Sequence, residues 1–206
     1  MTTRVVAQRA GVALGALLVL AGCAPAQELT LEQTPVEEEI TAVEVPPPPL
    51  IFRAPSNCST LLLAEQSDEL AAEGIELLRG PGSPGNEPVY VNGQSPEEAA
   101  GGISCLFGLP ADEDESISIV LSVAPVASAD RGDIIADLLA QNLNVGQTSD
   151  GKGLTYWIWG DETVVSALHN ELYEDSWYSA LVQPGGRPAY DQAVSLVASM
   201  RQATTS

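Results

Sequence analysis

Apolar and polar residues alternate with a period of two in several short stretches of the chain, and these stretches predict β-strands. The clearest is 117–124, where isoleucine, leucine and valine on one face alternate mostly with serine on the other. This period is typical of a strand with one face in the core. Apolar runs of strand length, bounded by turn residues, predict further strands at 103–109, 154–159, 163–169 and 177–182, with a short one at 89–91. We therefore expect an antiparallel sheet of about five strands.

Other segments carry apolar residues at helical spacing. A helix in one or two pieces is expected over 58–78, where Ser67 and the acids behind it offer a second N-cap. A serine, a proline and two glutamates at 95–98 predict a helical turn. Further helices are expected over 130–139 and from Pro188 onward, each with an apolar stripe. The sum predicts an α+β fold with the helices packed on one face of the sheet.

The first 22 residues have the organisation of a secretory signal peptide. Arg4 and Arg9 form a short basic region, residues 10–20 are apolar, and small residues follow. The apolar part is much shorter than the ~20 residues that a membrane-spanning helix needs. We therefore expect residues 1–22 to direct export and then to be removed.

The motif Leu20-Ala21-Gly22-Cys23 ends this region and resembles the lipobox of bacterial lipoproteins. The resemblance implies that a diacylglycerol is attached to the thiol of Cys23 and that the chain is cut before it. Each buried methylene contributes about 0.8 kcal/mol, and two or more acyl chains hold a protein stably on a bilayer. We expect a lipid anchor at the extracytoplasmic face of the cell membrane, which makes the membrane a partner. An ordinary signal peptide with a chance cysteine is the alternative.

Residues 23–51 form an acidic, proline-rich linker that begins with Cys23. The linker carries six glutamates and four consecutive prolines at 46–49. Because proline fixes φ and removes a backbone donor, this run predicts a stiff polyproline II spacer. A peptide ligand for a proline-binding partner is the alternative. The remaining residues, 52–206, have the length of a single domain.

The charge of the chain narrows the range of partners. The net charge is −20, and removal of residues 1–22 takes away two arginines and leaves −22. Such a charge repels nucleic acids and anionic lipid surfaces, so neither is expected as a partner. We expect no cofactor. The chain has one histidine and no C-x-x-C motif, so no metal site is expected either.

Cys58 and Cys105 remain once Cys23 carries lipid. An even pair of cysteines outside the cytoplasm predicts a disulfide. The chain thus combines a lipobox, an acidic linker and a domain with one cysteine ahead of the first helix and another on an early strand. This combination resembles small actinobacterial cell-envelope lipoproteins, and the resemblance implies a location more than an activity.

Five aromatic residues within a short segment are the candidate ligand-binding residues: Tyr156, Trp157, Trp159, Trp177 and Tyr178. In a strand, Trp157 and Trp159 point to one face and Tyr156 points to the other. Two interpretations remain open. The aromatic residues either pack in the core or form a platform for a sugar, peptide or acyl ligand.

Two weaker patterns offer candidate chemistry, a calcium site and a hydrolase site. The acidic run 112–115 offers carboxylates that suit calcium, but it lacks the spacing of a calcium-binding loop, so a solvated hairpin tip is expected. His169 and Ser166 offer a base and a hydroxyl for a hydrolase. However, the G-x-S-x-G motif is absent, and a strand would place these two residues on opposite faces.

These patterns together favour a binding or interaction domain of the cell envelope, lipid-anchored and without catalytic activity. Its expected partners, besides the membrane, are an envelope glycan, a peptide or a partner protein. Two alternatives remain: an envelope hydrolase that uses His169, and a structural or regulatory accessory lipoprotein without a ligand.

Overall fold

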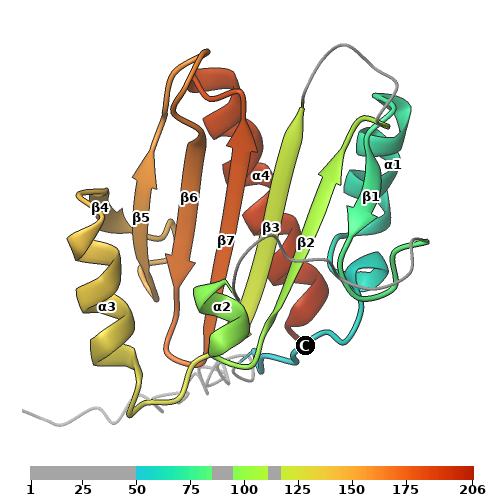
Figure 1. The fold of residues 1–206 in the computed structure, drawn as a ribbon. Helices are drawn as coiled ribbons and strands as arrows, with labels where there is room; N and C mark the ends of the chain where they lie inside the picture. The colour runs from blue at the N-terminus through green and yellow to red at the C-terminus, as the bar shows by residue number, and fades with distance from the viewer. Residues whose placement is uncertain (1–49, 85–94, 111–116) are drawn as a thin grey trace, which may run out of the picture. The chain divides into compact units, whose positions relative to one another are not determined.

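A seven-stranded antiparallel sheet forms the centre of the protein in a computed structural model, which describes residues 50–84, 95–110 and 117–206. The strand order is β1-β2-β3-β7-β6-β5-β4 (Figure 1). The strands are β1 (Glu76–Arg79), β2 (Ile103–Gly108), β3 (Ser118–Pro125), β4 (Asn144–Gln147), β5 (Leu154–Ile158), β6 (Ala167–Leu172) and β7 (Ser176–Gln183). The expected α+β class with an antiparallel sheet is confirmed, but the sheet has seven strands rather than about five.

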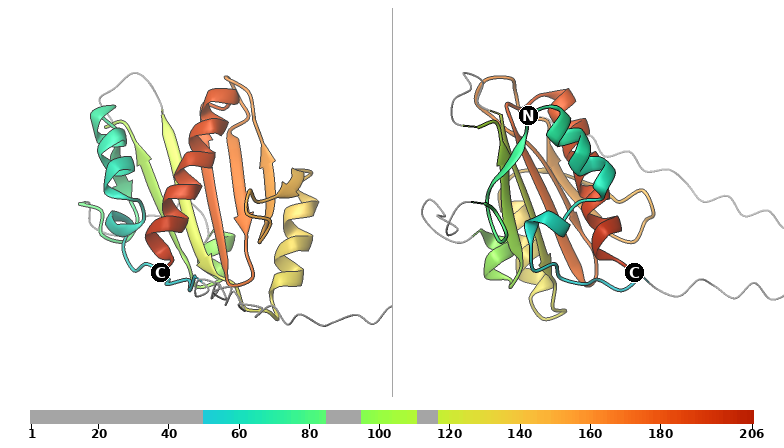
Figure 2. Two further views of the ribbon diagram at one scale, coloured as in Figure 1. Left: turned by 180° about the vertical axis from the view of Figure 1, so that it is seen from behind. Right: turned by 90° about the vertical axis from the view of Figure 1, so that its right-hand side faces the viewer.

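Helices cover both faces of the sheet, which corrects the expectation of helices on one face only. The helices are the 3-10 turn η1 (Cys58–Thr60), α1 (Ala64–Ala72), α2 (Pro96–Ala99), α3 (Arg131–Ala140) and α4 (Arg187–Thr204). Figure 2 shows α1 and α4 on one face, with the short α2 on the other. The packing of α3 against Tyr156 and Trp177 places it on the same face as α2. We call these two surfaces the α4 face and the α3 face.

Two strands were not expected, β1 and β4, and a third, β6, is clearly displaced from its expected position. Strand β1 occupies the end of the segment 58–78 that was expected to be helical, because Gly74 adopts a positive φ of 77° that ends α1. Strand β4 was not expected, because Val145 is its only large apolar residue and no alternation marks it as a strand. In the structure this side chain is exposed. Strand β6 begins at Ala167 rather than at 163. The expected strand 89–91 and the acidic loop 112–115 lie outside the described residues.

The larger core lies on the α4 face. Register pairs Ile119 with Val182, Leu121 with Ala180, and Val123 with Tyr178 across β3 and β7. These side chains are buried beneath α4 and the segment η1–α1, whose contributing residues are Leu61, Leu62, Leu70, Ala193, Leu196, Val197 and Met200. The alternation at 117–124 therefore identified the core face of β3 correctly.

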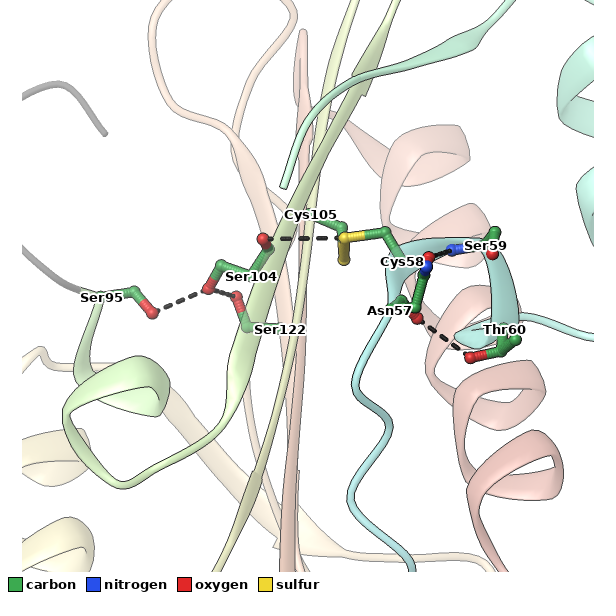
Figure 3. The surroundings of a disulfide bond; sticks show 8 residues. All are labelled: Asn57, Cys58, Ser59, Thr60, Ser95, Ser104, Cys105 and Ser122. Atoms are coloured by element: carbon green, nitrogen blue, oxygen red, sulfur yellow. Dashed lines mark hydrogen bonds between the residues drawn. A yellow bond between two sulfur atoms is a disulfide. The ribbon is translucent and has the colours of Figure 1, made fainter. Parts of the chain in front are cut away.

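The predicted disulfide is present between Cys58 in η1 and Cys105 in β2 (Figure 3). It ties the segment ahead of α1 to the sheet on the α4 face. Gly80 is required beside it, because a Cβ atom at this position would lie 2.5 Å from the sulfur of Cys58. Gly80 also adopts a φ of 125°, which side chains rarely tolerate.

A smaller core lies on the α3 face. Leu138 of α3 packs with Val126, Tyr156, Leu172 and Trp177. The start and the end of the described domain lie side by side, where Phe52 forms an antiparallel bridge with Thr205. Among the described residues, no helix is long and apolar enough to cross a membrane.

Candidate functional site

The five candidate aromatic residues do not share one surface. Tyr156 and Trp177 are buried on the α3 face, in the core beneath α3. Tyr178 is fully buried on the α4 face, and its hydroxyl lies 3.0 Å from Oγ1 of Thr204. Only Trp157 and Trp159 remain partly accessible. The core interpretation therefore holds for three of the five residues, and one platform built from all five is excluded.

Trp157 and Trp159 belong to a stack between β5 and α4. Their rings are stacked with centroids 5.7 Å apart, and Trp157 also lies 5.3 Å from the ring of Tyr190 in α4. The guanidinium of Arg187 lies 5.1 Å from the centroid of Trp159, within the range of a cation–π interaction. Helix residues thus occupy part of the aromatic surface. These contacts attach the start of α4 to the end of β5.

His169 is a buried part of the same arrangement. Its Nδ1 lies 3.4 Å from the hydroxyl of Tyr190, and its Nε2 lies 3.3 Å from Oε1 of Glu171. The hydroxyl of Tyr173 donates to the other oxygen of Glu171 at 2.6 Å. Burial opposes ionisation of Glu171, but the hydrogen bonds from His169 and Tyr173 outweigh it and lower the pKa of Glu171. Both ring nitrogens of His169 face these structural partners, while Ser166 precedes β6.

A small pocket lies on the α3 face. A pocket of about 230 Å³ lies between the start of α2 and the end of α3, over the middle of the sheet. Two rows of side chains, each in register across neighbouring strands, form its floor. The apolar row is Val120, Leu181 and Leu168, and the polar row is Ser122, Ser179 and Asn170. The apolar row is half-buried, and the polar row is buried.

Hydrogen bonds hold the polar row in place. Ser104 extends the row into β2, and its hydroxyl lies 2.6 Å from that of Ser122 and 2.8 Å from that of Ser95 at the N-cap of α2. Figure 3 shows this chain of hydroxyls on the side of β2 opposite to the disulfide. At the other end, the indole N–H of Trp177 donates to Oδ1 of Asn170 at 3.0 Å. The polar groups are therefore ordered rather than incidental.

Glu97 of α2 brings a carboxyl group to this pocket. Its position follows from the local sequence, because Ser95 and Glu98 form a capping box and Pro96 opens the helix. Only 6 % of Glu97 is exposed. Its side chain is hydrogen-bonded to Ser95 and Ser179. Among the described residues, Glu97 forms no ion pair with a basic side chain.

The surroundings of Glu97 make ionisation of its carboxyl group less favourable than it is in water. Burial raises the pKa of Glu97 above its usual value, and the neighbouring carboxylate of Glu98 raises it further. The hydrogen bonds from the backbone N–H of Glu97 and from the side chains of Ser95 and Ser179 act in the opposite direction but do not offset the burial. A buried carboxyl without a cationic partner in a pocket is the kind of group that marks a functional site.

Sequence reasoning did not find this site. The pattern at 95–98 predicts only a helical turn, in which Glu97 is one of two acids behind a serine cap and a proline. Ser122 was interpreted as part of the polar face of a half-buried strand, although Ser122 is 3 % exposed. The alternation of serine with apolar residues at 117–124 was the available signal. It did not reveal that two helices come together above those serines.

No group of three or more potential metal ligands occurs in the described part of the chain. Comparison with protein-family models, curated proteins and solved structures gave no match.

Proposed function

We propose that this protein is a lipid-anchored extracytoplasmic binding domain of the cell envelope and that its ligand site is the pocket between α2 and α3. One observation carries this proposal. The polar row and the carboxyl of Glu97 converge beside a half-buried apolar row in one pocket. A mainly apolar hollow with a few convergent polar groups is the usual form of a small-molecule site.

The energetics of the buried polar groups support the same proposal. In mutational series, a buried polar group that loses its hydrogen bonds costs about 1–3 kcal/mol, and a buried charge costs more. Apolar side chains at Glu97, Ser122 and Ser179 would avoid this risk, in a pocket that Leu138 also lines. Proteins commonly accept lower stability where a site must recognise a ligand. Polar groups at these positions are therefore better explained by recognition than by folding.

The anchor and the location rest on separate support. The lipobox-like motif ending at Cys23 and the linker 23–51 suit a domain held at a distance from a bilayer. The disulfide between Cys58 and Cys105 suits an oxidising compartment outside the cytoplasm. A membrane-attached domain with a small ligand pocket would sample molecules released at or passing through the envelope.

Native mass spectrometry of the full chain, purified from the membranes of a bacterial host that processes lipoproteins, tests the proposal. A Leu181→Trp variant fills the pocket, and Val164→Trp, at a residue that is 79 % exposed on the β5–β6 loop, serves as the matched control. We expect a non-covalent adduct on the wild type and on Val164→Trp that is absent from Leu181→Trp. The same adduct on all three, or none on any, would contradict a binding role for this pocket.

A further inference from the structure

We propose that the pocket between α2 and α3 binds an aliphatic ammonium group, with the nitrogen at Glu97 and the carbon chain along Val120, Leu181 and Leu168. This inference rests on the proposed function and names the ligand class of the same site. The ammonium is either that of a free alkylamine or that of a lysine-type side chain in a peptide.

The apolar row sets the body of the ligand. Val120, Leu181 and Leu168 lie directly opposite one another on β3, β7 and β6. Neighbouring strands are about 4.8 Å apart, so the row spans roughly 10 Å. This length suits one short alkyl chain. The pocket of about 230 Å³ is too small for the paired acyl chains of a phospholipid.

The polar row sets the head of the ligand. An ammonium group has three N–H donors and no acceptor. Glu97, Ser179 and Ser122 line the pocket and offer a carboxylate oxygen and two hydroxyl oxygens. The hydroxyls of Ser122 and Ser104 already share a hydrogen bond, but a hydroxyl oxygen has two lone pairs and can accept from the ligand as well. The three N–H donors of an ammonium group therefore match three acceptor oxygens, one each from Glu97, Ser179 and Ser122.

The charge of the site selects among possible head groups. Burial disfavours the Glu97 carboxylate, and no basic side chain of the described residues forms an ion pair with it. A cationic ligand supplies the missing partner, and a charge-assisted hydrogen bond in a buried site is stronger than a neutral one. A carboxylate ligand would instead meet Glu97 with a like charge. The net charge of −20 further raises the local concentration of cations and lowers that of anions.

The test uses three probes with the same six-carbon chain and different head groups: n-hexylamine, hexan-1-ol and hexanoate. Each is titrated calorimetrically at neutral pH into the full lipidated chain in non-ionic detergent. The variants are Glu97→Gln, the matched control Glu98→Gln, and the pocket-filled Leu181→Trp. Glutamine at residue 98 retains the capping box, since glutamine serves that position as well as glutamate does. A blocked lysine tripeptide, titrated in parallel, separates the peptide source from the free amine.

We expect hexylamine to bind Glu98→Gln within about twofold of its affinity for the wild type, because only a neighbouring charge is lost. It should bind Glu97→Gln at least about tenfold more weakly and should not bind Leu181→Trp. Stronger binding of the tripeptide than of hexylamine would identify a peptide side chain as the source, and the reverse would identify a free amine. Equal binding of the three probes, or unchanged binding of hexylamine to Glu97→Gln, would overturn the ammonium assignment. Absence of binding by all of the probes would overturn it too. The proposed function would still stand in that case if native mass spectrometry found an adduct on the wild type that is absent from Leu181→Trp.

Discussion

The indole N–H of Trp177 in β7 donates to Oδ1 of Asn170 in β6 at 3.0 Å, and this bond closes one end of the pocket. Both residues are buried, and Leu138 of α3 packs against Trp177. The bond fixes the indole ring with respect to the polar row. It therefore links the smaller core beneath α3 to the candidate site.

Substitution Asn170→Ala should lower the free energy of unfolding by about 1–3 kcal/mol, because it leaves the N–H of Trp177 buried without its partner. Trp177→Phe removes the donor of this bond. Asn170→Ala should therefore cost less free energy of unfolding in the Trp177→Phe protein than in the wild type. Urea unfolding of the two single variants and the double variant measures this coupling. Asn144→Ala, at an exposed amide that donates to the carbonyl of Trp157, should change stability by no more than about 0.5 kcal/mol. Strictly additive losses would contradict the coupling.

Substitution Glu97→Gln should increase stability at neutral pH by an amount on the order of 1 kcal/mol, because the amide has no ionised form to keep buried. The pKa of Glu97 is higher in the folded than in the unfolded chain, where it is about 4.5. The folded state therefore holds the proton more tightly, and the wild type loses stability as pH rises through the folded pKa.

Chemical unfolding measured at a series of pH values between 4 and 8 tests this. The free energies of unfolding of the wild type and of Glu97→Gln should differ little near pH 4, and the difference should grow as the pH rises. Glu98→Gln is the control: it keeps Glu97 but removes a neighbouring charge that raises its pKa, so the loss of stability with rising pH should persist and be smaller than in the wild type. A pH profile of Glu97→Gln parallel to that of the wild type would rule out Glu97 as the titrating group.

Asp150 should contribute stability that is lost in acid. Partial burial opposes its ionisation, but hydrogen bonds from the Thr148 hydroxyl, the Lys152 N–H and Arg201 lower its pKa to about 2. Because the folded pKa is depressed, the contribution is present above the unfolded value of 3.8 and disappears as pH falls through about 2. The melting temperature of Asp150→Asn should therefore fall less between pH 4 and pH 2 than that of the wild type. An equal fall in both would show that other carboxylates are responsible.

Removal of the disulfide should be costly. The two cysteines are 47 positions apart, and closing a loop of this length stabilises a protein by about 4 kcal/mol at most, because native strain reduces the gain. The double substitution Cys58→Ser and Cys105→Ser should lower the free energy of unfolding by about 2–4 kcal/mol. In a Cys23→Ala background, thiol titration of the denatured, unreduced chain should find no free thiol. Two free thiols would contradict the pairing.

The proposed anchor predicts a change of location. Cys23→Ala should move the protein from the membrane fraction to the soluble extracytoplasmic fraction, because no acyl chain can then be attached. The Cys58→Ser and Cys105→Ser variant should stay with the membranes, since it keeps Cys23. Fractionation followed by immunoblotting distinguishes the two. Membrane retention of Cys23→Ala would remove the support for lipid attachment.

The periodicity of the sequence predicted which side chains share one face of a strand, because this depends only on residues that are close in the chain. Trp157 and Trp159 share one face of β5 and Tyr156 takes the other, as strand geometry requires. The same rule places Trp177 and Tyr178 on opposite faces of β7. Which of these faces is covered, however, depends on α3 and α4, which are distant in sequence. The aromatic residues could therefore be assigned to strands, but not to a core or a surface.

The candidate site shows the same limit more clearly. Ser122, Ser179 and Asn170 come from three strands, and only the register of the sheet brings them into one row. Glu97 joins them because the capping box at Ser95 directs a four-residue helix over β2 and β3. A single sequence contains no direct record of such register. The short β4 was missed for a related reason, since its pairing with β5 involves the backbone rather than an apolar pattern.

The edge strands of the sheet determine how readily neighbouring copies of the protein could pair with one another. Both edge strands, β1 and β4, are only four residues long, and the register of β1 is interrupted between Leu77 and Arg79. A short or irregular edge gives a second chain few unpaired N–H and C=O groups to join. Copies that lie side by side therefore find few backbone groups through which the described sheets could join.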